Sequence, residues 1–267
     1  MSKTIGIISI KGGVGKTTIA SALASSLVNN FYEKVLLIDA NYSAPNLGMH
    51  MDILQPEKTI HEVLANEARI KSSIHSRFGV DVIPGSYVFK NQFNPLKLRD
   101  KIRLLKNDYD LIILDSSPSL NEEVLSTILA SDNLFVVSTP DYPTLYCSLK
   151  AAKLAKQRGR PISGIILNKI RDPKYELSLK EIEETLDIPV VAKIPDDKAA
   201  ARSLFMRIPI PIYSKHSEFS KEITNLSSAL ANKKEKRSFI GLFFPDFKRE
   251  QVNRQILKES FYTSSFS

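Results

Sequence analysis

The stretch that decides the fold runs Lys11-Gly12-Gly13-Val14-Gly15-Lys16-Thr17-Thr18. It follows an apolar run, residues 5–10, and precedes a helix-like run, residues 18–28, so a strand, a glycine-rich turn and a helix are predicted in that order. Glycines let successive backbone N–H groups turn inward around a phosphate, and the helix N-terminus adds positive partial charge. The stretch therefore predicts a phosphate-binding loop in which Lys16 reaches the β- and γ-phosphates and the Thr17 hydroxyl ligates Mg²⁺.

Apolar runs alternate with helix-like segments along the rest of the chain. Runs such as Leu36–Ile38 and Leu111–Leu114 are apolar on both faces, which is typical of parallel strands covered by helices on each side. The pattern predicts an α/β fold of the P-loop type, with a doubly wound, mostly parallel sheet flanked by helices. Strands are predicted at residues 4–10, 34–39, 79–83, 111–115, 133–138, 163–168 and 189–193, and helices at 16–29, 59–66, 97–106, 121–130, 144–157, 176–186, 197–205 and 214–231.

The composition is that of an ordinary globular protein, with 43% hydrophobic and 25% charged residues in a chain of 267. There is no apolar run of about 18 residues, so no membrane-spanning helix is predicted, and the N-terminus does not resemble a signal peptide. The single cysteine, Cys147, excludes an internal disulfide and metal sites built on paired cysteines. It also fits a reducing compartment, so we expect a cytoplasmic protein.

Positive charge is concentrated at the C-terminus. Residues 232–267 carry eight lysines and arginines against four acidic residues, and so hold half of the formal net charge of +8. The basic residues bracket an aromatic cluster, residues 238–247, whose apolar side chains share one side if the segment is helical. We therefore predict a domain of residues 1–231 and a tail of residues 232–267 that meets an anionic surface, either lipid or nucleic acid. A tail folded back onto its own domain is the alternative.

Two acidic residues end apolar strands of the predicted sheet. Asp39 ends the strand of residues 34–39, and Asp115 ends the strand of residues 111–115. Ligands of such sheets bind at the carboxyl ends of the strands, where the phosphate loop also lies. A carboxylate in this place holds Mg²⁺ directly or through water. The predicted metal ligands are therefore Thr17, Asp39 and Asp115.

The phosphate loop departs from the usual G-x-x-x-x-G-K-[ST] pattern, because Ile10 stands at the first glycine position and Lys11 follows it. KGGVGKTT resembles the deviant Walker A motif of the MinD/ParA family of ATPases, and the resemblance extends over roughly residues 3–230. It implies ATP and Mg²⁺ as cofactors, nucleotide contacts from residues 12–18, and a homodimer that forms with ATP. In that family the second lysine reaches across the dimer to the partner's nucleotide, a role that falls to Lys11 here.

Residues 39–48 resemble the switch I segment of the family and contain the main departure from it. The family usually has Asp-x-Asp there, and its second Asp contacts the attacking water; this chain has Asn41 at that position. An amide cannot accept a proton as a carboxylate can, but it can orient a water, and phosphoryl transfer depends mostly on positioning and charge neutralisation. We expect slow ATP hydrolysis, with Lys11, Lys16, Asp39 and Asn41 as the catalytic residues. An inactive hydrolase, or Asn41 as a simple turn residue, is the alternative.

Three further segments resemble parts of the family's site. Residues 116–119 resemble switch II, whose backbone N–H groups sense the γ-phosphate. Asn168 ends a predicted strand and would pair with the adenine edge through its amide. Pro195 and Asp196 end the next strand, and Pro195 would flank the adenine ring. These residues complete the predicted nucleotide site.

Three functions remain open at this point. The tail resembles the short, basic, aromatic membrane-targeting segment of MinD-like members. It implies an ATP switch that lies peripherally on the inner face of the cell membrane, positions cellular machinery and answers to a protein partner or activator. A ParA-like partition ATPase, binding DNA nonspecifically through basic surface, is the second possibility. A P-loop biosynthetic ligase is the third, but the sequence offers no candidate residues for a second substrate.

Overall fold

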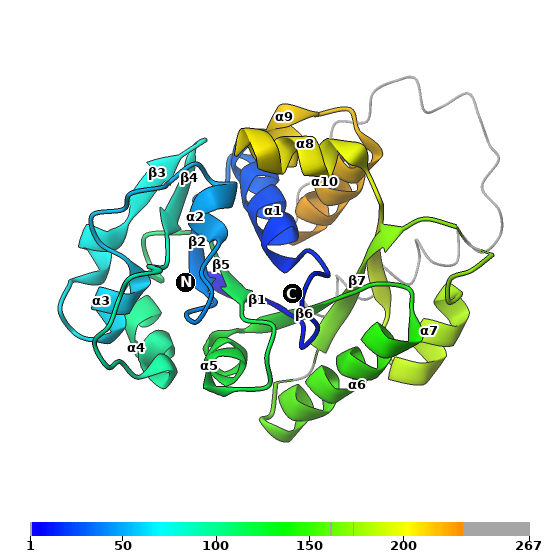
Figure 1. Ribbon diagram of the computed structural model, residues 1–267, viewed down its shortest axis with the longest axis horizontal. Helices are drawn as coiled ribbons and strands as arrows, with labels where there is room; N and C mark the ends of the chain where they lie inside the picture. The colour runs from blue at the N-terminus through cyan, green and yellow to red at the C-terminus, as the bar shows by residue number, and fades with distance from the viewer. Residues whose placement is uncertain (1, 161, 173, 232–267) are drawn as a thin grey trace.

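A sheet of eight strands lies at the centre of the protein, in a computed structural model that describes residues 2–160, 162–172 and 174–231 (Figure 1). The strand order is β3-β4-β2-β5-β1-β6-β7-β8, and all neighbouring strands are parallel except β3 and β4. This arrangement confirms the predicted doubly wound, mostly parallel sheet. The strands are β1 (Lys3–Ile8), β2 (Val35–Ala40), β3 (His75–Arg77), β4 (Val80–Ile83), β5 (Leu111–Ser116), β6 (Asn133–Ser138), β7 (Ile162–Ile170) and β8 (Val190–Pro195).

Helices cover both faces of the sheet. Figure 1 shows α1, α8, α9 and α10 together on one face, and α3 to α7 on the other. The α1 and α10 helices share one apolar core with the sheet, in which Leu23 and Phe219 are buried; each side chain of this size contributes about 1.5–3 kcal/mol when fully buried. The helices are α1 (Lys16–Phe31), α2 (Leu47–His50), α3 (Ile60–Leu64), η1 (Ile70–Ser73), η2 (Pro95–Lys97), α4 (Leu98–Arg103), α5 (Glu122–Ala130), α6 (Tyr142–Gln157), α7 (Leu179–Leu186), α8 (Lys198–Met206), α9 (Ile210–Tyr213) and α10 (Glu218–Leu230).

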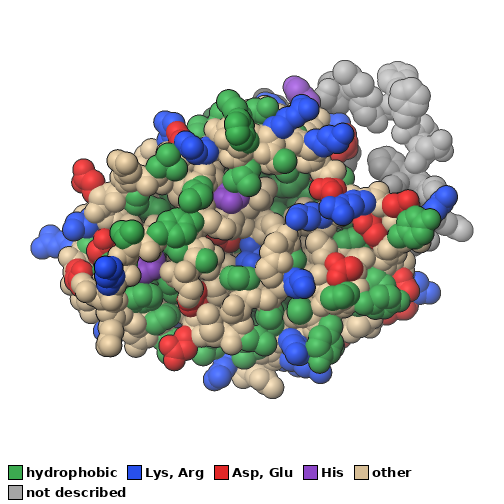
Figure 2. All heavy atoms as spheres, in the orientation of Figure 1, with side chains coloured by type: hydrophobic (Ala, Val, Ile, Leu, Met, Phe, Trp, Pro, Cys, Tyr) green, Lys and Arg blue, Asp and Glu red, His purple; other side chains and the backbone are tan. Residues whose placement is uncertain are grey.

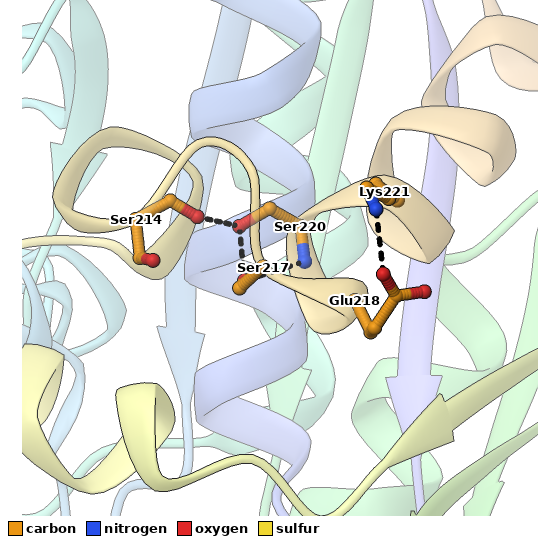
Figure 3. A network of polar contacts seen from close by, with 5 residues as sticks. All are labelled: Ser214, Ser217, Glu218, Ser220 and Lys221. Atoms are coloured by element: carbon orange, nitrogen blue, oxygen red, sulfur yellow. Dashed lines mark hydrogen bonds and ion pairs between the residues drawn. The ribbon is translucent and has the colours of Figure 1, made fainter.

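The predicted helix of residues 214–231 begins later than expected, at Glu218 (Figure 3). Ser217 caps the helix, because its hydroxyl accepts the backbone N–H of Ser220 at 3.1 Å. The Ser220 hydroxyl donates to the carbonyl of Ser214 at 2.7 Å, which holds the preceding turn outside the helix. An ion pair of 2.5 Å joins Lys221 to Glu218 on the first turn. The serine cap, rather than the apolar periodicity, fixes where the helix starts.

The pattern also misses the shortest elements. The β3 strand has three residues with no apolar signal, and it pairs with β4 through its backbone and a hydrogen bond from the Ser76 hydroxyl to the Asp81 carboxylate. The α2 and α9 helices have four residues each, which is too short for a helical period to be visible in the sequence.

The C-terminal tail, residues 232–267, lies outside the described residues. Its predicted contact with lipid, with nucleic acid or with its own domain therefore stays a prediction. Among the helices that the structure describes, none has both the length and the apolar character needed to cross a bilayer.

Candidate active site

The predicted phosphate loop joins β1 to α1 at the carboxyl end of the sheet (Figure 1). The β1 strand lies between β5 and β6, so the loop opens at a point where ligands bind in sheets of this kind. Gly13 and Gly15 have φ angles of 78° and 97°, a left-handed conformation that glycine adopts without steric cost. Lys16 then begins α1 and is buried. The loop thus has the backbone shape that the motif predicts.

The end of β7 holds the phosphate loop from the side. The Asn168 amide donates to the carbonyl of Val14 at 2.7 Å, and the Lys169 ammonium donates to the carbonyl of Gly13 at 2.8 Å. A Cβ atom at Gly15 would lie 2.4 Å from the Asn168 amide nitrogen, so only glycine allows this approach. In this structure Asn168 supports the loop through its NH₂ group, and its predicted pairing with adenine stays a prediction.

Asp39 and Asp115 lie side by side, because they are opposite residues of the neighbouring strands β2 and β5. Both side chains are fully buried. Neither oxygen of the Asp115 carboxylate has a hydrogen-bond partner among the described residues. Unpartnered buried oxygens beside a hydroxyl, that of Thr17, are the donor set that a hard divalent cation such as Mg²⁺ prefers. The arrangement fits the predicted metal site.

Burial shifts the ionisation of all three charged groups in this site. It raises the pKa of Asp115, against the opposing effects of the nearby Thr17 hydroxyl and Lys16 charge. Burial, together with the charge of Asp115, raises the pKa of Asp39 well above its usual value. Burial also lowers the pKa of Lys16, while Asp115 raises it. Burial therefore shifts the pKa of each group in the direction that favours its neutral form.

The β2–α2 loop, residues 41–46, wraps around Asp39. The Asp39 carboxylate accepts the backbone N–H groups of Asn41 at 3.0 Å and of Leu47 at 3.1 Å. At the end of the loop, the Asn46 amide oxygen accepts the Thr17 hydroxyl at 2.9 Å. Since this bond uses the proton of the hydroxyl, the lone pairs of the Thr17 oxygen are left for a metal ion. Asn46 is a site residue that the sequence analysis does not single out.

Asn41 is buried, with 7% of its surface exposed, and its amide points back into its own loop. The NH₂ group donates to the carbonyl of Ala44 at 2.5 Å. The amide oxygen is also buried and has no partner among the described residues. This contact is not an Asx turn, in which the side-chain oxygen accepts a backbone N–H, because here the NH₂ group donates and the oxygen has no partner among the described residues. The role of Asn41 stays a prediction.

Comparison with known proteins identifies the family that carries this site. A family profile described as "AAA domain" matches residues 2–151. An uncharacterised ATP-binding protein of Methanocaldococcus jannaschii is 31% identical over 91% of this chain and 96% of its own length. The cell division ATPase MinD of Pyrococcus furiosus has a TM-score of 0.81 at 29% identity, over 85% of this chain and 98% of its own. The chain belongs to the MinD/ParA family of P-loop ATPases.

The septum site-determining protein MinD of Pyrococcus horikoshii was solved with Mg-ADP. It has a TM-score of 0.82 at 27% identity, over 91% of this chain and all of its own. The predictions of ATP and Mg²⁺ as cofactors and of a MinD/ParA-type ATPase are thereby confirmed.

The remaining predicted residues of the MinD/ParA site lie around the same loop. Lys11 is exposed, as a lysine that reaches a second subunit must be. Pro195 ends β8 opposite Ile170 of β7, which brings the predicted adenine residues to one edge of the sheet. Asp196 forms an ion pair of 2.6 Å with Arg171. A Cβ atom at Gly12 would lie 3.9 Å from Pro118, so the predicted switch II segment borders the phosphate loop.

His61 is a further buried contact of the β2–α2 loop. The four histidines of the chain have no metal-ligand spacing in the sequence, so no role is expected for His61 from the sequence alone. In the structure its Nδ1 accepts the backbone N–H of Ser86 at 3.0 Å, which leaves Nε2 as the protonated nitrogen. Nε2 lies 3.0 Å from the carbonyl of Tyr42 and donates to it. Burial lowers the pKa of His61, so the neutral ring bridges this loop to the segment after β4.

Proposed function

We propose that the protein is a MinD-like switch that binds ATP and Mg²⁺ at residues 11–18, dimerises with ATP and hydrolyses it slowly. The observation that supports this most strongly is the Asp115 carboxylate, buried beside Thr17 and Lys16 with no partner on either oxygen. Leaving a buried polar group unpartnered costs about 1–3 kcal/mol, and more for a charged group. A metal ion and nucleotide bound at the loop would remove that cost.

The metal site is proposed to be shared between protein and nucleotide. Within the described ranges, no three Asp, Glu, His or Cys side chains gather closely enough to hold a metal ion by themselves. We assign Thr17, Asp39 and Asp115 as its protein side, directly or through water, with phosphate oxygens completing the shell. When bound, Mg²⁺ neutralises charge on the phosphates. Lys16 and the backbone N–H groups of residues 12–18 would hold the phosphates at the start of α1.

Slow hydrolysis follows from the chemistry of Asn41. Its amide oxygen can accept a hydrogen bond from the attacking water and orient it, but it cannot take the proton away. Asp39 contributes by holding the loop that carries Asn41, through the bond to the Asn41 backbone N–H. The catalytic contribution of this loop is therefore positioning, which is the larger part of phosphoryl-transfer catalysis. Lys11 is proposed to supply positive charge to the nucleotide of the partner subunit.

The surface that the switch binds is proposed to be an anionic membrane, reached by the tail of residues 232–267. A tail that combines lysines and arginines with a Phe/Leu cluster suits a bilayer better than DNA. The aromatic cluster can be buried in lipid, whereas binding to DNA does not require it. Each basic residue adds about 1 kcal/mol on anionic lipid, so one tail binds weakly. Two tails held in one dimer bind far more tightly, because the second insertion is intramolecular. ATP would thereby control residence on the inner face of the cell membrane.

Co-sedimentation tests this proposal. The full chain is mixed with liposomes containing anionic lipid or with duplex DNA, each with ATP and with ADP. We expect more protein on the liposomes with ATP than with ADP, and less at high salt. Deleting residues 236–267 should abolish the binding and leave ATP-dependent dimerisation unchanged. Binding to DNA alone, or undiminished liposome binding by the truncated chain, would replace the membrane proposal with the ParA-like one.

A further inference from the structure

Glu123 is a buried carboxyl group outside the predicted site. It lies in the first turn of α5, with 8% of its surface exposed. Its Oε1 accepts the hydroxyl of Ser43, in the middle of the β2–α2 loop. Its Oε2 is buried without a hydrogen-bond partner among the described residues. A carboxyl group held in this way, half satisfied and touching a loop of the active site, calls for a role beyond packing.

The other side of Glu123 is tied to the β5–α5 loop, residues 117–121, which overlaps the predicted switch II. Asn121 caps α5, and its side-chain oxygen accepts the backbone N–H of Glu123 at 3.1 Å. The same oxygen accepts the hydroxyl of Ser117 at 3.2 Å. Consecutive polar contacts therefore lead from Ser117 through Asn121 and Glu123 to Ser43. They join the loop after β5 to the loop after β2.

A second contact keeps the β2–α2 loop against the same helix. The hydroxyl oxygens of Tyr42 and Ser126 lie 3.5 Å apart, and both side chains are buried. The Tyr42 ring packs edge-on against His61, with 5.9 Å between the ring centres. Tyr42 and the adjoining Ser43 thus both hold the β2–α2 loop against α5.

We propose that Glu123 is a positioning residue that couples the β5–α5 loop to the β2–α2 loop and thereby to Asn41. The proposal rests on the proposed ATPase function. When the β5–α5 loop responds to a γ-phosphate, the first turn of α5 moves with it, and Glu123 carries Ser43, and with it Asn41 two residues earlier in the same loop, toward the attacking water. The unpartnered Oε2 offers the moving loop a second acceptor, so the contact persists while the loop changes its shape.

Steady-state ATP hydrolysis by the full chain tests the coupling, with Ser43→Ala, Glu123→Ala and the double variant compared with wild type. We expect each single variant to lower kcat about tenfold, the loss of one hydrogen bond to a charged group, with KM unchanged within about twofold. The double variant should be no slower than the slower single variant, because both substitutions remove the same contact. Ser43→Thr keeps the hydroxyl and should keep the rate.

Two controls separate coupling from general damage. Glu122→Ala truncates the neighbouring, exposed glutamate of the same helix and should leave kcat unchanged. Ser43 is exposed, so Ser43→Ala is expected to fold normally. Hydrogen exchange of residues 41–46 provides a second readout: ATP should alter their exchange relative to ADP in wild type and do so far less in Ser43→Ala.

The outcomes distinguish the two proposals. Single variants with wild-type kcat, or a double variant whose loss is the product of the two single losses, would overturn the coupling and leave the ATPase proposal in place. A wild-type protein that neither binds nor hydrolyses ATP would overturn both.

Discussion

Replacing Asn41 with aspartate probes how the β2–α2 loop is held. The Asn41 amide donates to the Ala44 carbonyl at 2.5 Å, and its backbone N–H donates to Asp39 at 3.0 Å. An ionised aspartate in this conformation would place an oxygen without a proton against a carbonyl oxygen, at a position with 7% exposure. The fully buried Asp39 lies two residues away, so the new carboxylate also meets a like charge.

The lost hydrogen bond and the unpartnered oxygens should together cost about 2–4 kcal/mol of folding free energy. Burial and the neighbouring Asp39 raise the pKa of the new carboxyl above its unfolded value of about 3.9. Below that value the carboxyl is protonated in both states and can donate its O–H to Ala44, so the penalty is absent. As pH rises through the raised folded pKa, the unfolded state loses its proton more readily and stability is lost. The deficit therefore grows from acid to neutral pH.

Thermal unfolding without nucleotide measures this deficit. A chain of this size loses about 2–4 °C in Tm per kcal/mol, so Asn41→Asp should unfold about 4–16 °C below wild type at neutral pH and close to wild type in acid. Asn41→Ala lacks the donor but adds no charge, so its smaller deficit should not depend on pH. With ATP and Mg²⁺ present, Asn41→Asp should hydrolyse ATP faster, because a carboxylate can accept the proton of the attacking water. A variant as stable as wild type at neutral pH, or a brisk wild type that the substitution slows, would refute this account of Asn41.

Four further outcomes are expected from the same site. Lys16→Ala should abolish tight ATP binding in a fluorescent-nucleotide titration, since the phosphates lose their nearest cation; unchanged affinity would contradict the phosphate-loop assignment. Lys11→Ala should bind ATP yet stay monomeric by light scattering, while Lys97→Ala, at an exposed lysine of η2, should dimerise normally; an ATP dimer of the first variant would show that Lys11 does not cross the interface. Asn46→Ala should need about tenfold more Mg²⁺ for half-maximal ATP binding, because the Thr17 hydroxyl loses the acceptor that orients it; its affinity for ATP in chelator should equal that of wild type. In chelator, wild-type affinity for ATP should fall as pH rises from about 5 to 8, because Asp115, whose pKa burial raises to about 6, loses its proton over this range and repels the phosphates; an affinity that rises over this range would place this carboxylate away from the nucleotide.

The sequence predicts the fold well because its signal is repeated. Strands such as β2 and β5 are apolar on both faces and carry an aspartate one residue before their end. Each strand therefore indicates independently that it is buried and where it ends. Elements fixed by a few polar contacts give no such repetition. The start of α10 depends on the Ser217 cap, and β3 depends on backbone pairing with β4. Neither leaves a periodic pattern in the chain.

The residues of the site likewise fall into those that the sequence predicts and those that it does not. Residues 11–18 are predictable because the phosphate loop needs particular residue types at fixed spacing. Asn46, His61 and Glu123 act through contacts with residues that lie 29, 19 and 80 positions away in the chain, to Thr17, Tyr42 and Ser43. Residue types such as serine, asparagine and glutamate are so common in protein sequences that no spacing between them identifies such long-range contacts. For Asn168 the sequence predicts a place in the site, but it does not predict the hydrogen bond from the Asn168 amide to the Val14 carbonyl.

The amide at position 41 also affects the charge balance of the site, because it adds no negative charge beside the two buried aspartates. Asp39 and Asp115 are opposite neighbours, both fully buried, and each raises the free energy of ionising the other. Lys16 is the buried cation beside them, and burial already lowers its pKa. A third carboxylate in the loop that encloses Asp39 would add repulsion to this pair, with Lys16 as the buried cation to oppose it. An amide instead lets the loop close on Asp39 and bond to Ala44, and in doing so it removes the one group of the loop that could have taken the proton from water.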